Sequence, residues 1–154
     1  MTRHFELCAE GDEDALATLT FLSMFGSLAK GLSDDGCWTF KRAGFIRTYV
    51  TVRDWQAQED LAIFRNNTWA GGGTLELADG TRYLANSNFW QTRYDIRTTD
   101  ETPVVTFERI GGLLHLSSDV IVHEQARSVR QLPWLVMLGW YLTVMHHGDS
   151  AVVS

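Results

Sequence analysis

The feature that most constrains this chain is an uninterrupted apolar run at residues 132–145, LPWLVMLGWYLTVM. As a helix it would carry bulky apolar side chains on every side, and Thr143 and the Tyr141 hydroxyl would be its polar groups. A helix without a polar face either lies in a protein core or spans a membrane. The choice between these two positions decides which architectures the chain can adopt.

The length of this run favours the core. Residues 132–147 would form a helix about 24 Å long. A membrane-spanning helix needs roughly 20 apolar residues to cross about 30 Å of hydrocarbon. Pro133 suits the first turn, where its missing N–H costs nothing, and Gly148 lies where helices commonly end. We therefore predict no membrane span and a helix enclosed by protein.

The composition is that of an ordinary globular protein. The 154 residues are 45% hydrophobic and 21% charged, and they suffice for a single domain over 1–154 with a sizeable core. The net charge of −6 argues against a broadly basic nucleic-acid-binding surface. Cys8 and Cys37 lack metal-type spacing and no signal peptide is recognisable, which predicts reduced thiols in a cytoplasmic protein.

Residues 1–35 are predicted to form a short strand and an amphipathic helix. The strand would occupy residues 2–9. The helix would occupy residues 15–32, after the acidic segment 11–14, which suits the positive end of a helix dipole. Its apolar residues recur at helical spacing; they are Phe21, Leu22, Phe25, Leu28 and Leu32.

From residue 36 to about 125 the apolar residues recur with period two. Asp79-Gly80, between predicted strands at 74–78 and 81–85, is the strongest hairpin signal. About nine antiparallel strands follow one another, and two of them, at 113–116 and 120–124, flank a predicted turn at 117–119. A meander of this kind is typical of a barrel or a sandwich. A barrel interior must be filled, and a helix at 132–147 that is apolar on all faces would fill it.

In this layout the chain resembles the tubby-like superfamily: the tubby C-terminal domain, the plant LURP-one-related proteins and the phospholipid scramblases. The resemblance is carried by the meander at 36–124, the helix at 132–145 and its Leu-Pro-Trp start at 132–134. It implies an α+β fold in which an antiparallel β-barrel surrounds a central helix, here with an added N-terminal helix. Kinship suggests lipid binding, but the motifs of eukaryotic tubby proteins are not visible, so no phosphoinositide-binding residue is carried over.

Two helix residues carry specific expectations. Gly139 lies mid-helix, where glycine is unfavourable by about 1 kcal/mol relative to alanine, so we expect a strand side chain to pack closely against it. Trp140 would be buried if the helix is central, and its replacement by alanine would then cost roughly 3–5 kcal/mol.

Arginines on predicted strands form the most suggestive polar set. Arg93 and Arg97 share one strand face with Asp95, and Arg47 and Arg53 share another. Facing outward, they could form a shallow site for an anion or a lipid headgroup. The alternative is a mixed-charge exterior in which Asp95 pairs with the flanking arginines.

Trp55 and Trp69 fall in predicted loops. Exposed loop aromatics can anchor a partner or a ligand. They can equally cover the open end of a barrel, so the sequence alone leaves both interpretations open.

The histidines suggest two weaker hypotheses. His146 and His147, with Asp149, could ligate a metal, although adjacent helical residues point about 100° apart and a histidine also suits a helix C-terminus. His115 and His123 lie near Asp119 and imitate a hydrolase set, but no nucleophile elbow or other local motif accompanies them.

Three functions therefore remain open. The first, favoured by the filled barrel and the lack of a catalytic motif, is a non-enzymatic binding or scaffold module for a phospholipid headgroup or a protein partner. Its candidate contacts are Arg47, Arg53, Arg93, Arg97, Trp55 and Trp69. The second is a lipocalin-like carrier, which needs an empty barrel and an external helix. The third is a hydrolase-like enzyme. The sequence assigns no cofactor, metal or catalytic residue and leaves the oligomeric state open.

Overall fold

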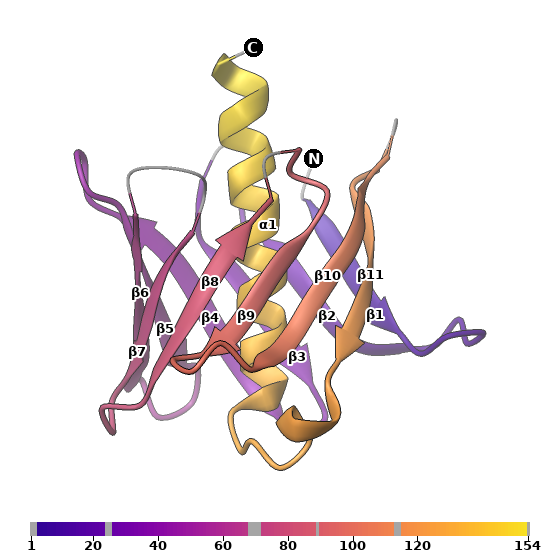
Figure 1. The fold of residues 1–154 in the computed structure, drawn as a ribbon, viewed down its shortest axis with the longest axis horizontal. Coiled ribbons are helices and arrows are strands. Elements are labelled where there is room, and N and C mark those ends of the chain that lie inside the picture. The colour runs from indigo at the N-terminus through magenta and orange to yellow at the C-terminus, as the bar shows by residue number, and fades with distance from the viewer. Residues whose placement is uncertain (1–2, 24–25, 68–71, 89, 113–114, 154) are drawn as a thin grey trace.

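The structure, a computed structural model, contains one antiparallel sheet and one long helix (Figure 1). It describes residues 3–23, 26–67, 72–88, 90–112 and 115–153, of which 149–153 are described by their backbone alone. The predicted mainly-β fold with a C-terminal helix is confirmed at this level.

The sheet has eleven strands. They are β1 (His4–Cys8), β2 (Ala15–Phe21), β3 (Ala29–Ser33), β4 (Gly36–Ala43), β5 (Tyr49–Asp54), β6 (Asp60–Asn66), β7 (Gly73–Leu77), β8 (Arg82–Ser87), β9 (Tyr94–Thr98), β10 (Pro103–Gly111) and β11 (Ser117–Val122). A short 3-10 helix, η1 (Glu124–Ala126), leads to the long helix α1 (Leu132–Val153).

The strands follow one another across the sheet in chain order, each antiparallel to the next. The sheet curls around α1, as Figure 1 shows, and α1 contacts β2, β3, β4, β9 and β10. Among the described strands, β1 and β11 each pair on one side only. The sheet is thus an open meander around a helix, and the closed barrel expected from the sequence is not observed.

The strands form because their apolar residues alternate with polar ones. In β5, Val50 and Val52 are buried, whereas Thr51 is half-buried and Arg53 is exposed. The neighbouring β6 buries Ala62 and Phe64 in register with them. This period of two directs one face of each strand to the core and the other to solvent. The predicted Asp79-Gly80 hairpin is confirmed between β7 and β8.

The predicted N-terminal helix is wrong, because Ala15–Phe21 form β2 and Ala29–Ser33 form β3. Phe25, one of the apolar residues assigned to that helix, lies outside the described residues. Ala17, Leu19 and Phe21 are buried on one face, while β-branched threonines alternate with them on the other. Threonine favours a pleated strand over a helix. The acidic segment 11–14 belongs to the β1–β2 loop, where Gly11 has a positive φ of 80° and the Asp12 amide donates to the Ala9 carbonyl at 3.0 Å.

The turn predicted at 117–119 is also wrong, because these residues begin β11. The register between β10 and β11 shifts between Glu108 and Gly111, and the Ser118 hydroxyl donates to the Glu108 carbonyl at 2.8 Å. Such a bulge is not visible in the residue pattern. Of the strand expected at 113–116, His115 and Leu116 are not in a strand and 113–114 lie outside the described residues.

Helix α1 is buried around nearly its whole circumference. Leu135, Leu138 and Tyr141 have no exposed surface. A Cβ on Gly139 would overlap the buried ring of Phe107 and lie 3.1 Å from Ile96 Cδ1. The expected close packing against Gly139 is confirmed. Trp140 is partly buried and packs against the core, and the cost expected for Trp140→Ala stays a prediction.

Tyr141 fastens α1 to the sheet. Its ring stacks on Phe21 at 5.5 Å between centroids and on Phe40 at 5.7 Å. Its hydroxyl donates to the Ser27 carbonyl at 2.6 Å, in the loop between β2 and β3. Burial raises the pKa of Tyr141 to about 12. The phenol is therefore held in its protonated, hydrogen-bond-donating form.

No helix among the described residues is both long and apolar enough to cross a lipid bilayer.

Two glycines of α1 test the packing of the helix. We expect Gly139→Ala to lower the free energy of unfolding by about 1–3 kcal/mol, since its methyl group would overlap a ring that cannot move. Gly148→Ala should instead raise it by up to about 1 kcal/mol, because alanine favours the helix and a Cβ there meets nothing within 4 Å. Chemical denaturation measures both changes; the same sign for both variants would contradict this packing.

Tyr141 also predicts an alkaline weakness. Its folded pKa exceeds the unfolded value of about 10, so the stability it contributes is complete below pH 10 and is lost between pH 10 and about 12. Tyr141→Phe should lower the free energy of unfolding at pH 7 by about 1 kcal/mol and flatten this alkaline decline. Denaturation curves recorded from pH 7 to 12 measure both effects.

Tyr94→Phe is the matched control. The Tyr94 hydroxyl is fully buried and has no hydrogen-bond partner among the described residues. Removing it should leave the stability at pH 7 unchanged or higher. An equal loss at pH 7 in the two variants would show that the Ser27 hydrogen bond contributes nothing.

Candidate functional site

The meander sorts its loops between two ends. Because each strand reverses direction, consecutive loops lie at opposite ends of the sheet (Figure 1). One set comprises residues 9–14, 34–35, 55–59, 78–81 and 99–102. The other comprises the described residues of the connections at 22–28, 44–48, 67–72, 88–93 and 112–116. Helix α1 finishes at the second end, where the His147 Nε2 and the Gln91 carbonyl lie 2.8 Å apart. The two ends differ sharply in chemistry.

The first set of loops forms an acidic end. Its carboxylates are Glu10, Asp12, Glu13, Asp14, Asp34, Asp35, Glu59, Asp79, Asp100 and Glu101. These loops are described in full, and none carries Lys or Arg. The segment after β11 adds Arg127 and Arg130 near this end. The field of the acidic end is therefore strongly negative.

Hydrogen bonds favour the ionised form of two of these carboxyl groups. The Thr81 amide donates to Asp79 Oδ1 at 2.9 Å and lowers the pKa of Asp79. The Thr98 hydroxyl, then that of Thr102, lower the pKa of Asp100 in the same way. Because the charged forms are stabilised, both carboxylates stay negative into mildly acidic solution.

The second set of loops forms what we call the apolar end. Phe45 and Ile46, at the tip of the β4–β5 hairpin, are 99% and 87% exposed, and Trp90, between β8 and β9, is 77% exposed. Arg47 is exposed beside Phe45 and Ile46. The described residues of these loops include no Asp or Glu. Apolar side chains this exposed are a feature of binding surfaces.

Local structure holds these side chains outward. Gly44 turns the β4–β5 hairpin at φ 89°, where a Cβ would collide with the Arg47 carbonyl. In the Trp90 loop, the Asn88 side-chain oxygen accepts from the amides of Thr92 at 2.9 Å and Arg93 at 3.0 Å. The exposed side chains therefore project from ordered turns.

The arginines predicted as a site are mostly engaged in ion pairs. Arg93 and Arg97 both contact Asp95 Oδ2, at 3.3 and 3.2 Å. Arg53 pairs with Asp60 at 2.9 Å, at the acidic end. The structure thus does not gather the predicted arginines into one anion site, and the pairing alternative describes Arg93, Arg97 and Arg53. Arg47 lies in the β4–β5 loop and Arg93 directly before β9, so both are at the apolar end.

The two loop tryptophans have different outcomes. Trp55 is exposed at the acidic end, where the Lys30 ammonium lies 4.5 Å from the centre of its ring. It is therefore far from Arg47, with which it was grouped by sequence. Trp69 lies outside the described residues.

A set of hydrogen-bonded polar side chains on the outer face of the sheet was not predicted from the sequence. The Thr106 hydroxyl donates to Asp95 Oδ1 at 2.7 Å, so His123 Nε2, 2.8 Å from the same hydroxyl, must donate to it. Asp95 and Thr106 are buried. Because the Thr106 hydroxyl donates to Asp95, this hydrogen-bonded set of three side chains stabilises a carboxylate and does not activate a nucleophile. His115 lies at the other end of β11, so the hydrolase set is not assembled.

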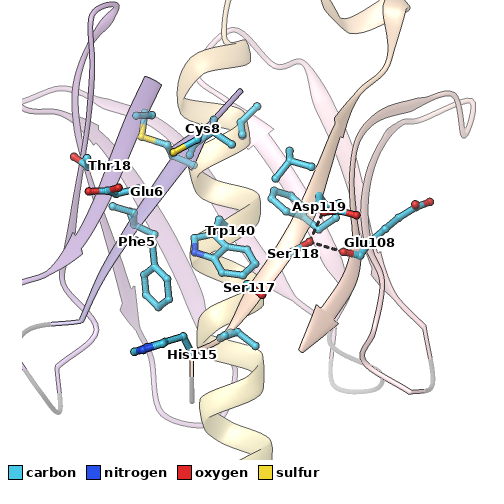
Figure 2. Close-up of a pocket in the computed structure, with 18 of the residues that line it drawn as sticks. Phe5, Glu6, Cys8, Thr18, Glu108, His115, Ser117, Ser118, Asp119 and Trp140 are labelled. Carbon is cyan, nitrogen blue, oxygen red and sulfur yellow. Dashed lines mark hydrogen bonds between the residues drawn. The ribbon is translucent and has the colours of Figure 1, made fainter. Parts of the chain in front are cut away.

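The side of the molecule between β1 and β11 is open. A cavity of about 1120 Å³ lies there, floored by Val136, Met137 and Trp140 of α1. Trp140 contacts Phe5 of β1 at 5.6 Å and Phe107 of β10 at 6.0 Å between ring centres. Figure 2 shows Trp140 between Phe5 on one side and Ser117 and Ser118 on the other. We call this opening the edge slot.

No protein-family model, curated protein or solved structure matches this chain. Among the described residues, no group of three or more His, Cys, Asp or Glu side chains is placed to hold a metal ion. The molecule thus offers two candidate surfaces, the apolar end and the edge slot.

The Thr106 hydrogen bonds give a stability test. Thr106→Val keeps the shape but removes the donor to buried Asp95, which should lower the free energy of unfolding by about 1.5–3 kcal/mol. Thr20→Val is the matched control, because Thr20 bonds to His4 at 2.7 Å on the exposed surface and its loss should cost below about 0.5 kcal/mol. Chemical denaturation compares them; equal effects would contradict the role of Thr106.

Proposed function

We propose that this chain is a non-enzymatic module that binds membrane surfaces reversibly, end-on, through its apolar end. The observation that carries the proposal is the β4–β5 tip, where Phe45 and Ile46 are almost fully exposed beside Arg47. Aromatic and aliphatic side chains enter the lipid interface, and a neighbouring arginine is attracted to the negative charge of an anionic lipid surface. Trp90, on another loop at the same end, supplies a second aromatic contact.

The energies fit reversible binding. Full burial of a Phe or Ile side chain contributes about 1.5–3 kcal/mol, and insertion into the interface contributes part of that. Each basic residue near an anionic surface adds about 1 kcal/mol. Arg47 supplies this electrostatic contribution. Arg93 contributes less, because it is also paired with Asp95. Together these contacts support docking that needs no spanning segment.

The uneven charge supports one orientation. A net charge of −6 opposes approach to an anionic membrane, but the carboxylates of the hairpin loops lie at the acidic end. A seven-residue strand such as β2 separates the ends by about 23 Å. This exceeds two Debye lengths of about 8–10 Å at physiological salt, so the repulsion is largely screened when the apolar end faces the lipid.

Membrane binding agrees with the lipid binding that the resemblance to the tubby-like superfamily implies, and kinship with that superfamily remains part of the proposal. The carrier alternative is less favoured because α1 lies inside the curled sheet, where a carrier would hold its ligand. The hydrolase alternative is less favoured because His115 and His123 lie at opposite ends of β11.

Vesicle co-sedimentation tests the proposal. We expect the protein to bind vesicles of phosphatidylcholine with phosphatidylserine, and the double variant Phe45→Ser/Ile46→Ser to bind about tenfold more weakly or less, because a loss of 1.4 kcal/mol is tenfold. Arg47→Gln should weaken binding to these anionic vesicles and leave binding to pure phosphatidylcholine unchanged.

Leu16→Ser is the control, because Leu16 is 58% exposed next to the acidic end. It removes exposed apolar surface at the wrong end and should bind vesicles as the unaltered protein does. Vesicle binding that is absent, or that falls equally in the Leu16 and Phe45/Ile46 variants, would contradict end-on docking.

A further inference from the structure

The edge slot has a topology that one more strand would complete. Each strand is antiparallel to the next, so in a sheet of eleven strands β1 and β11 run in the same direction, as Figure 1 shows. A single inserted strand antiparallel to both edges would continue the alternation on each side. Direct pairing of β1 with β11 would instead break the alternation by making a parallel pair.

Backbone groups on both edges face the slot. The Phe21 amide donates to the Arg3 carbonyl at 2.8 Å, which places Arg3 among the residues of the β1 side that bond to β2. Bonding alternates along an antiparallel ladder, so His4 and Glu6 direct their N–H and C=O groups away from β2. On the other edge, the His123 amide donates to the Val104 carbonyl at 3.0 Å. By the same alternation Val120 and Val122 direct theirs away from β10.

The floor of the slot is apolar and its size suits an extended chain. Phe5 and Leu7 line it from β1, Val120 from β11 and Trp140 from α1, and all four are only partly buried. The volume of about 1120 Å³ exceeds the roughly 300–1,000 Å³ of most small-ligand pockets. The lining follows both edge strands along their length.

The rim of the slot is acidic. Four carboxylates line it, on Glu6, Glu10, Glu108 and Asp119, against two guanidinium groups. Both guanidinium groups have partners: Arg109 pairs with Asp119, and Arg3 lies 4.1 Å from the centre of the Phe21 ring and donates to the Gly26 carbonyl at 3.0 Å. An occupant with basic groups facing outward would complement the remaining carboxylates.

We propose that the edge slot binds one extended segment of a partner protein, antiparallel to β1 and β11, in which apolar residues alternate with lysine or arginine. The apolar residues face Trp140 and the basic residues face the carboxylates. Main-chain hydrogen bonds to both edges supply affinity and the alternate side chains supply specificity, as in other cases of strand addition. This surface is distinct from the apolar end, so the two proposals stand or fall separately.

A capped, fluorescently labelled heptapeptide of alternating valine and lysine is the probe. Its control has the same composition with all valines in one block, so that charge is equal and alternation is lost. Fluorescence anisotropy should show binding of the alternating peptide to the full chain and binding about tenfold weaker or less for the block peptide. Hydrogen exchange should show protection of the amides of His4, Glu6, Val120 and Val122 on binding.

Two variants at one exposed position separate backbone from charge. Glu6→Gln removes the carboxylate and keeps the N–H that faces the slot. Glu6→Pro removes that N–H as well, without removing a bond of the β1–β2 ladder. Each step should weaken the alternating peptide, the second by roughly three- to tenfold beyond the first. If Glu6→Pro does not fold, the exchange pattern of the unaltered protein decides the question alone.

Three results would overturn the proposal. Equal binding of both peptides would mean that charge alone attracts them. Protection of the His4 and Glu6 amides in a peptide-free dimer would make a second copy of the chain the occupant. Protection of the same amides by phosphatidylcholine vesicles would make a lipid acyl chain the occupant.

Discussion

The rest of this structure depends on the need to cover a helix that has no polar face. Residues 135–138 are consecutive in α1, so their side chains point about 100° apart around the helix, and all four are buried. A flat sheet would cover one side of such a helix, so the strands must curl around it. Gly139 then allows β10 to approach closely, because Phe107 occupies the space where a side chain would be. The hydroxyl of Tyr141 also links the helix to a loop of the sheet.

An antiparallel meander around one helix also places loops of different chemical character at opposite ends of the same sheet. Consecutive loops lie at opposite ends, so changes in alternate loops accumulate at one end alone. In this chain one set of loops became acidic and the other apolar, while the strands between them kept the same inward pattern. The two candidate surfaces thus arise from positions that contribute little to the core: hairpin tips and sheet edges.

The sequence predicted the elements whose signal is local, and it failed where partners are distant. The apolar helix beginning at Leu132, the Asp79-Gly80 hairpin and the close packing at Gly139 were predicted from an apolar run, a dipeptide and a glycine in mid-helix. The end of the helix was predicted wrongly, because α1 continues past Gly148 to Val153. Residues 15–32 were mistaken for a helix because their apolar spacing fits two periods. The hydrogen bonds of Thr106 in β10 reach Asp95 in β9 and His123, which directly follows β11, and the order of residues does not indicate them. The extent of Trp140 burial could not be predicted, because the sequence does not show where the sheet stays open.

The order of elements has a consequence for synthesis. Helix α1 follows all eleven strands, so the ribosome synthesises every strand before it synthesises the helix that fills the curled sheet. Until then the inner side chains, among them Phe21, Phe40 and Phe64, lack their main partner. Strands can pair as they emerge, but the packed core forms only once α1 has left the exit tunnel. The nascent chain therefore carries an uncovered apolar concave surface and depends on shielding until that moment.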